Sequence, residues 1–459
     1  MNLAVHGLEG NIQKAITYYE DPHELLGKAD FVMANPPFNV DEVDADKIKR
    51  DPRLSFGLPG VNKEGKVSNG NYLWISYFYS YLNETGRAGF VMSSQASSAS
   101  RDEAKVRQAL IEAGAVDIMI AVRSNFFYTR TVPCELWFLN RAKPEQHEGK
   151  VLMVDARNIY RKVTRKIYDF SPEQLQNLLS IVWLYRGEGD RYCALVASYL
   201  KQTLAEASAC FTKKDRDGRE IRPLDDYLAT LSSVQETVLP FLDTLSPDAA
   251  HAEVLGQLKT GMVTFLQDLS ALRHQSETEA EKWEDQRHTT ELNETTGRLN
   301  ALVEFTRNLT KQSDSLYKVA GSLIDVSESE LAAKESDLWV NREVAKARKA
   351  VDSTRQVAVN QLKQVRYYHK QAVWLTERFP DGELRDVEGL VKLVDKNELE
   401  SNDWSLTPGR YIGLALEDED GGGDFEETLR EMHIELESLN AEAVKLAAKI
   451  KKSFEGLGI

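Results

Sequence analysis

The distribution of proline limits what the second half of this chain can form. No proline occurs between Pro247 and Pro380, a run of 132 residues that contains four glycines. Proline breaks helices and glycine weakens them, so their scarcity in a stretch rich in Ala, Leu, Glu, Gln, Lys and Arg predicts long α-helices. We expect the isolated apolar residues of this stretch to be packing residues, because an amphipathic helix buries its apolar face.

Composition limits the class of protein. With 459 residues, 42% hydrophobic and 28% charged, the chain has the makeup of a globular protein of about two to four domains. The densest apolar run, residues 73–82, is too short to span a bilayer, and the first residues do not resemble a secretion signal. We therefore expect a cytoplasmic protein without a membrane partner. Its three cysteines are too scattered for a disulfide framework, and we expect no metal site.

Charge is unevenly distributed along the chain. Residues 1–170 carry 22 basic and 21 acidic side chains, a net charge of +1, whereas residues 171–459 carry 35 basic and 51 acidic ones, a net charge of −16. A protein that grips DNA by itself usually presents a basic surface. If nucleic acid is the substrate, another chain must therefore supply much of the contact.

The first part of the chain alternates short β-rich runs with helical ones. Predicted strands cover residues 30–34, 88–92, 116–122, 134–139 and 151–155, and predicted helices cover 71–83 and 101–112. This alternation is typical of βα units and predicts an α/β fold with a mostly parallel sheet. We place an α/β domain in residues 1–170, a connecting segment in 171–204, a helical insertion in 205–375 and a further block in 376–416.

The end of the chain has a different pattern. Residues 417–424 include three consecutive glycines and are typical of a flexible acidic linker. After them, apolar residues recur at alternating spacings of four and three, namely Phe425, Leu429, Met432, Leu436, Leu439, Ala443, Leu446 and Ile450. This seam predicts a coiled-coil-like helix in residues 425–459. The helix could dock on the chain's own helical region, but its tether and apolar seam favour docking on a partner.

Asn35-Pro36-Pro37-Phe38 is the most informative motif. Such a tetrad with an aromatic fourth residue should arise by chance in about one chain of this length in a hundred. It follows a predicted buried strand, and open α/β sheets bind ligands at the carboxyl ends of their strands. The alternative is a rigid turn that binds nothing.

This tetrad suits an exocyclic amine such as adenine N6, whose lone pair is delocalised into the ring. Two acceptors that hold its hydrogens, the Asn35 side-chain oxygen and the Pro36 carbonyl, would localise that lone pair on nitrogen. The two prolines fix φ and remove competing N–H donors, and Phe38 offers a face on which a base can stack. An amine inside duplex DNA is out of reach, so the base must be flipped out.

The tetrad resembles the amino-group motif of S-adenosylmethionine-dependent N6-adenine DNA methyltransferases, and its surroundings resemble the modification subunit of type I restriction–modification enzymes. The resemblance covers about 1–200 and 375–459 and rests on residues 69–74, 86–92, 126–133, 136–139, 151–157, 379–387 and 405–413. It implies a partial Rossmann-like sheet followed by a mostly α-helical region. It also implies methyl transfer to adenine N6 in DNA, with a specificity subunit and, through the assembled complex, a restriction subunit as partners.

The resemblance assigns roles to particular residues. Asn35, Pro36, Pro37 and Phe38 would hold the target adenine, and Phe126 or Phe127, with a slight preference for Phe126, would form the opposite wall of the base pocket. Asp21 lies where the family has an acidic residue near the cofactor's adenine, although a turn before Pro22 explains it equally well. The tail seam would bind the specificity subunit. Five basic residues could meet DNA phosphates or form a solvated face, namely Arg157, Arg161, Lys162, Arg165 and Lys166.

The sequence departs from the family at the cofactor site. The family places a Phe-x-Gly-x-Gly-like turn ahead of the tetrad, and residues 1–34 contain none. We therefore expect either a truncated or split modification subunit that is inactive alone, or a subunit that works only with a separately made N-terminal piece. One alternative is a non-catalytic scaffold that binds the specificity subunit. Another is a protein glutamine methyltransferase, which Phe38, in place of tyrosine, and the long tail both disfavour.

Overall fold

The chain forms two compact units in the computed structural model, which describes residues 2–414 except 128–130, 165–166, 247–250 and 285–286. The first unit comprises residues 1–124, 132–157 and 386–459, and the second comprises 125–131 and 158–385. The first unit is therefore interrupted after Arg157, and the expected block of residues 376–416 is shared between the units. The expected linker and tail helix lie outside the described residues.

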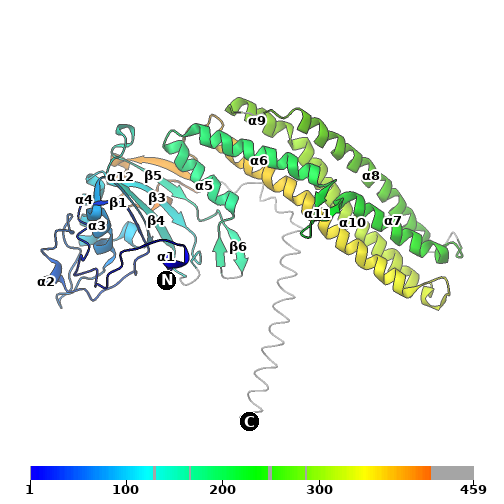
Figure 1. Cartoon of the computed structure of the whole chain (residues 1–459), viewed down its shortest axis with the longest axis horizontal. Helices are drawn as coiled ribbons and strands as arrows, with labels where there is room; N and C mark the ends of the chain where they lie inside the picture. Colours follow the sequence, from blue (N-terminus) through cyan, green and yellow to red (C-terminus); the bar gives the residue numbers. More distant parts are fainter. Residues whose placement is uncertain (1, 128–130, 165–166, 247–250, 285–286, 415–459) are drawn as a thin grey trace, which may run out of the picture. The chain divides into compact units, whose positions relative to one another are not determined.

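A six-stranded mixed sheet forms the centre of the first unit (Figure 1). In spatial order its strands are β1 (Ala29–Ala34), β2 (Leu82–Ser93), β4 (Cys134–Asn140), β3 (Val116–Val122), β5 (Lys150–Asp155) and β10 (Val391–Asp395). The β1–β2 and β3–β5 pairings are parallel, whereas the β2–β4, β3–β4 and β5–β10 pairings are antiparallel.

The five expected strands are present, but the expectation of a mostly parallel sheet is wrong. After β3 the chain turns back, and β4 enters the sheet antiparallel to both β2 and β3. The C-terminal block then adds β10 antiparallel to β5. Antiparallel neighbours need no helical crossover, so the alternation of strands and helices in the sequence does not reveal them.

Helices α3 (Asn71–Tyr81) and α4 (Asp102–Glu112) pack on one face of this sheet (Figure 1). They form its core with alternate residues of the strands, and the largest members are Tyr72, Phe78, Phe90, Met119 and Trp137. Burying each such side chain contributes about 1.5–3 kcal/mol. The short helices α1 (Asn2–Val5), α2 (Ala45–Ile48) and α12 (Lys396–Ser401) belong to the same unit.

Residues 386–412 complete this unit from the far end of the sequence. The buried Arg107 guanidinium donates hydrogen bonds to the carbonyls of Ala99, Asp403 and Trp404. The hydroxyls of Ser97 and Thr407 lie 2.7 Å apart. The C-terminal block is therefore part of the α/β unit and not an appendage.

The second unit is mainly helical, as the proline-free run predicts. Its helices are α5 (Pro172–Tyr185), α6 (Gly189–Ala209), α7 (Pro223–Leu242), α8 (His251–Glu281), α9 (Thr289–Arg298), α10 (Asn300–Ser329) and α11 (Asn341–Arg378). The longest, α11, packs against α6, α7 and α10, and α10 packs against α8. Two small hairpins, β6 (Arg161–Thr164) with β7 (Ile167–Asp169) and β8 (Lys213–Lys214) with β9 (Glu220–Ile221), accompany them. Within the described ranges, no helix has the length and apolar character needed to cross a membrane.

The carboxyl group of Glu135 is buried against the sheet. Glu135 of β4 is 2% exposed, and its Oε1 atom accepts a hydrogen bond of 3.2 Å from the Ser97 hydroxyl. Burial raises the pKa of the Glu135 carboxyl to about 8, although the Ser97 hydrogen bond and the charge of Arg157 oppose the shift. At neutral pH the protonated carboxyl therefore predominates in the folded protein.

This shift predicts a pH-dependent stability. A folded-state pKa above the unfolded value of about 4.3 means that the contribution of Glu135 is complete below pH 4 and is lost as the pH rises toward 8. Between pH 5 and 8 the first unit should lose roughly 2–5 kcal/mol of stability through this group, and Glu135→Gln should remove that loss. Hydrogen exchange of β4 amides in urea at several pH values measures it. The exposed Glu112→Gln is the control, and parallel pH profiles for Glu135→Gln and wild type would contradict the prediction.

Candidate functional site

The Asn-Pro-Pro-Phe tetrad forms a bend directly after β1, at the carboxyl end of the strand. Asn35 and Pro37 are exposed, Pro36 is buried, and Phe38 is half-buried against the core of the sheet. Within the described residues, neither the Asn35 side chain nor the Pro36 carbonyl has a hydrogen-bond partner. Both acceptor oxygens are thus free to bind a ligand among the described residues, and the packing of Pro36 and Phe38 anchors the bend.

A pair of side-chain amides holds this bend in place. The Asn39 backbone N–H donates to Asn71 Oδ1 at 2.9 Å, and Asn71 Nδ2 donates back to Asn39 Oδ1 at 2.9 Å. Asn69 Nδ2 donates to the same Asn39 oxygen at 3.1 Å. Asn39 has a φ of 56°, a left-handed conformation that asparagine tolerates better than most residues. We call this group of three asparagines the amide clasp.

The backbone next to the amide clasp is also closely packed. The Gly70 N–H donates to the Val40 carbonyl at 2.6 Å, just before α3 begins. A Cβ atom at position 70 would lie 3.1 Å from that carbonyl oxygen and 3.3 Å from the Tyr18 hydroxyl. A side chain at position 70 would therefore crowd its neighbours, and Gly70 allows this close approach between the bend and the first turn of α3. The residues Asn69-Gly70-Asn71 were part of the family resemblance, but the sequence did not indicate that they contact Asn39.

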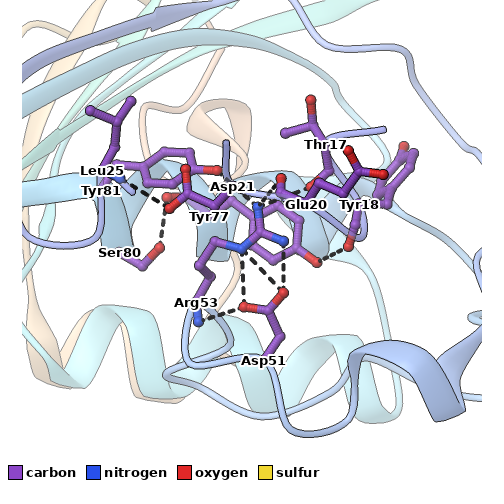
Figure 2. A network of polar contacts seen from close by, with 10 residues as sticks. All are labelled: Thr17, Tyr18, Glu20, Asp21, Leu25, Asp51, Arg53, Tyr77, Ser80 and Tyr81. Carbon is purple, nitrogen blue, oxygen red and sulfur yellow. Dashed lines mark hydrogen bonds and ion pairs between the residues drawn. The ribbon is translucent and has the colours of Figure 1, made fainter. Parts of the chain in front are cut away.

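Asp21 lies in a segment that a buried arginine organises (Figure 2). Arg53 is 3% exposed, and its guanidinium donates to both oxygens of Asp51, to the carbonyls of Thr17 and Glu20, and to the Tyr81 hydroxyl. The guanidinium carbon also lies 4.1 Å from the centre of the Tyr77 ring.

The environment of Arg53 keeps it charged. Burial alone would lower the pKa of its guanidinium, but the hydrogen bonds to Asp51 and Tyr81 outweigh burial and raise it. In turn, Arg53 holds the pKa of the half-buried Asp51 carboxyl below its usual value despite burial. This ion pair fixes the turn that carries Asp21.

Asp21 itself caps that turn. Its Oδ2 atom accepts a hydrogen bond of 3.0 Å from the Leu25 N–H, and its carbonyl accepts one from the Glu24 N–H (Figure 2 shows the first). These bonds fit the turn role of Asp21. Contact between Asp21 and the cofactor stays a prediction.

The two phenylalanines predicted for the base pocket belong to the second unit, whereas the bend belongs to the first. The Phe126 ring packs against Phe170, with ring centres 4.4 Å apart, and edge-to-face on Phe127 at 6.0 Å. Both rings are half-buried. The structure therefore does not bring them together with Asn35 in one unit, and their role stays a prediction.

The predicted phosphate contacts divide between the units as well. Arg157 pairs with the buried Asp155 in the first unit, where its Nε atom lies 2.9 Å from Oδ1. Arg161 pairs with Asp169 across the β6–β7 hairpin of the second unit, at 2.8 and 2.9 Å. Lys162 lies on the same hairpin, and the remaining two, Arg165 and Lys166, lie outside the described residues. Two of these cations are thus engaged by carboxylates of the chain itself.

The described side chains do not favour a cysteine nucleophile or a metal centre. The cysteines Cys134, Cys193 and Cys210 are buried and free, and burial raises the pKa of the Cys134 thiol to about 11 and also raises that of Cys193. These thiols are poor nucleophiles at neutral pH. In the described ranges, no group of three or more His, Cys, Asp or Glu side chains is placed to hold a metal ion.

The described residues do not form a complete cradle for S-adenosylmethionine. β1 is the edge strand of the sheet, and no described strand of this unit leads into a helix through a Gly-x-Gly turn. Gly57 and Gly60 lie within the long connection between β1 and α3. Asp21 is the one cofactor contact that the sequence predicted. The seam residues Phe425, Leu429, Met432, Leu436, Leu439, Leu446 and Ile450 lie outside the described residues.

Residues 1–199 match the family profile N-6 DNA Methylase. The chain is 38% identical over 183 residues to the type I restriction enzyme MjaIX methylase subunit of Methanocaldococcus jannaschii, a match that covers 39% of this chain and 32% of that protein. It is 30% identical over 180 residues to the HindI methylase subunit of Haemophilus influenzae, covering 39% of each. The chain thus spans about a third of the length of these relatives. The type I methyltransferase subunit from Streptococcus thermophilus aligns with a TM-score of 0.34 and 23% identity, covering 39% of this chain and 37% of that one.

The amide clasp generates a prediction about the bend. Asn71→Ala removes both of the part-buried hydrogen bonds that Asn71 makes with Asn39, a loss of about 1–3 kcal/mol. The amides of Asn35 and of residues 38–40 should therefore exchange with deuterium at least tenfold faster, while β2 amides stay protected. Asn83→Ala, which removes an exposed hydrogen bond of 2.7 Å to Asp30, is the matched control. Unchanged exchange in residues 35–40 would show that the clasp does not hold the bend.

Proposed function

We propose, because residues 1–199 belong to the N-6 DNA methylase family, that this chain is the catalytic part of a type I modification subunit that methylates adenine N6 in DNA. The observation that carries the proposal is the bend after β1, which presents two uncommitted oxygens beside a half-buried aromatic ring. S-adenosylmethionine supplies the methyl group in this family. The chain's own task is to hold and activate the amine.

The bend activates the amine by position. Asn35 Oδ1 and the Pro36 carbonyl each accept one N–H of the flipped adenine, which draws the nitrogen toward a pyramidal geometry and localises its lone pair. Pro36 and Pro37 carry no N–H that could compete, and the amide clasp holds the bend before the base arrives. Phe38 stacks on the base. Stacking contributes on the order of 1–3 kcal/mol and offsets part of the cost of flipping.

The acidic charge balance and the incomplete cofactor site indicate that the chain acts together with partner proteins. The acidic balance of residues 171–459 favours a complex in which a specificity subunit selects and grips the DNA. The described residues contain no glycine-rich turn for the cofactor, so that turn comes from outside them, and the restriction subunit joins through the assembled complex. A non-catalytic scaffold is the second candidate, favoured by the incomplete cofactor cradle. Measurable binding of S-adenosylmethionine to the isolated chain in calorimetry would rule the scaffold out.

Removing the Asn35 acceptor tests the proposal. In the complex reconstituted with the specificity subunit and the N-terminal piece, Asn35→Ala should lower methyl transfer to a hemimethylated duplex by about 100-fold or more. Cofactor binding, measured by calorimetry, should stay within twofold of wild type. The half-buried Asn83→Ala should methylate normally, and full activity of Asn35→Ala would overturn the assignment.

The tail seam gives a separate prediction. Leu436→Glu combined with Leu439→Glu places two charges in the seam and should abolish co-purification with the specificity subunit, because burying unpaired charges is costly. Ser438→Glu, off the seam, is the matched control and should assemble normally. Circular dichroism should show both proteins folded. Intact assembly of the double variant would show that the seam does not bind this partner.

A further inference from the structure

One helix of the second unit concentrates positive charge. Helix α11, the longest of this unit (Figure 1), carries nine basic and three acidic side chains. The helices α7, α8, α9 and α10 together carry six basic and 14 acidic ones. Basic side chains gathered along one helix are the electrostatic footprint of a surface that binds a polyanion.

The exposed side of α11 carries hydrogen-bond donors. Positions that follow one another at alternating spacings of four and three residues lie on one face of a helix. Opposite the buried face of α11, such a row contains six exposed residues and the half-buried Lys363, namely Arg342, Lys346, Lys349, Ser353, Gln356, Asn360 and Lys363. Each of these side chains can donate a hydrogen bond, and none is a carboxylate. We call these seven residues the donor stripe.

The donor stripe differs from an ordinary solvated helix face. Such a face usually alternates acidic and basic residues three or four positions apart, because these pairs stabilise the helix. Here two carboxylates of α10 pair with arginines beside the stripe instead. Asp325 lies 2.7 Å from Arg348, and Asp314 lies 2.6 Å from Arg355. The acidic side chains next to the stripe are therefore already matched by cations outside it.

Positive charge on the donor stripe remains available to a ligand. Arg342 and Lys349 form no ion pair with a carboxylate of the described residues. Lys346 lies 3.8 Å from Glu343, and both side chains are largely exposed. A solvated pair of this kind contributes little free energy, so a multiply charged anion can replace it.

The length and chemistry of the donor stripe indicate which anion it fits. At a rise of about 1.5 Å per residue, Lys363 lies about 32 Å along the helix from Arg342, close to one turn of duplex DNA at about 34 Å. Lysine, arginine, serine, asparagine and glutamine are the side chains that bind phosphate oxygens in protein–DNA complexes. DNA presents a negative charge about every 1.7 Å along its axis, whereas an acidic protein helix offers isolated carboxylates. The stripe therefore fits a nucleic-acid backbone better than an acidic protein segment.

We propose that the donor stripe of α11 binds the phosphate backbone of duplex DNA, independently of base sequence. The contact goes beyond the proposed function, which concerns the target base, and it gives the helical unit a role of its own. Screening over about 8 Å at physiological ionic strength prevents distant carboxylates of the chain from cancelling the local attraction. The acidic helices beside α11 repel phosphates, so the DNA lies along the stripe.

Binding of a DNA duplex of about 30 base pairs, roughly three helical turns, to the full chain tests the proposal. Fluorescence anisotropy should show an affinity that falls steeply with salt, because each phosphate contact releases condensed counterions. Arg342→Gln combined with Lys349→Gln should weaken binding at least fivefold and reduce the slope of log affinity against log salt by about 2. Lys201→Gln combined with Lys259→Gln, at exposed positions of α6 and α8, changes the net charge equally and should bind within twofold of wild type.

Several outcomes would overturn the proposal. They are the absence of binding at about 50 mM salt, equal binding by the two double variants, and a salt slope that the stripe variant leaves unchanged. The same holds if carbodiimide cross-links Lys349 to carboxylates of residues 417–437 and saturating duplex does not prevent it, because the stripe would then hold an acidic protein segment. Circular dichroism should show all variants folded.

The bend and the donor stripe can be tested separately. Asn35→Ala should bind the duplex within twofold of wild type, because it removes no phosphate contact of the stripe. Normal methyl transfer by Asn35→Ala would therefore count against the proposed function and leave the DNA contact of α11 standing.

Discussion

Two reciprocal hydrogen bonds between Asn39 and Asn71 decide the geometry of the candidate site. They join the end of the bend to the first turn of α3, and α3 is in turn fixed on the sheet by Tyr72 and Phe78. The bend can leave Asn35 exposed because Pro36 and Asn39 anchor it on either side. An uncommitted acceptor in a rigid bend loses little freedom when it binds, which is the physical advantage of preorganisation.

Two buried ionisable side chains of the same unit differ in their protonation at neutral pH. Arg53 stays ionised because Asp51, two carbonyls and a hydroxyl surround its guanidinium. Glu135 has a single weak donor in Ser97 and is protonated at neutral pH instead. The ionised Arg53 holds a loop in place through its hydrogen bonds, whereas Glu135 remains in the core as a neutral polar group. Both agree with the rule that a buried charge persists only when it is fully paired.

The sequence predicted local structure better than long-range pairing. Strand β3 begins and ends at the predicted residues, and α3 begins at Asn71 as expected, because apolar runs and capping segments are encoded locally. The order of strands was not predictable, since a run of apolar residues does not specify its neighbour in the sheet. The pairing of β10 with β5 likewise joins residues far apart in the chain.

The same limit applies to the candidate site. The tetrad was recognisable because its four residues are consecutive, and the family profile covers it. The clasp was not, because Asn39 and Asn71 are 32 positions apart and either asparagine alone reads as a turn residue. Arg53 gave no signal either, since a single arginine in a polar loop is ordinarily solvated.

The late arrival of β10 has a consequence for biosynthesis. The chain leaves the sheet at Asp155 and returns at Val391, so the whole helical unit emerges from the ribosome before the sixth strand does. Until then β5 has an unpaired edge, and the buried Arg107 lacks two of its three carbonyl acceptors. Contacts between such distant residues close slowly. An unpaired strand edge can pair with another chain, so the late arrival of β10 leaves the edge of β5 open to aggregation during synthesis.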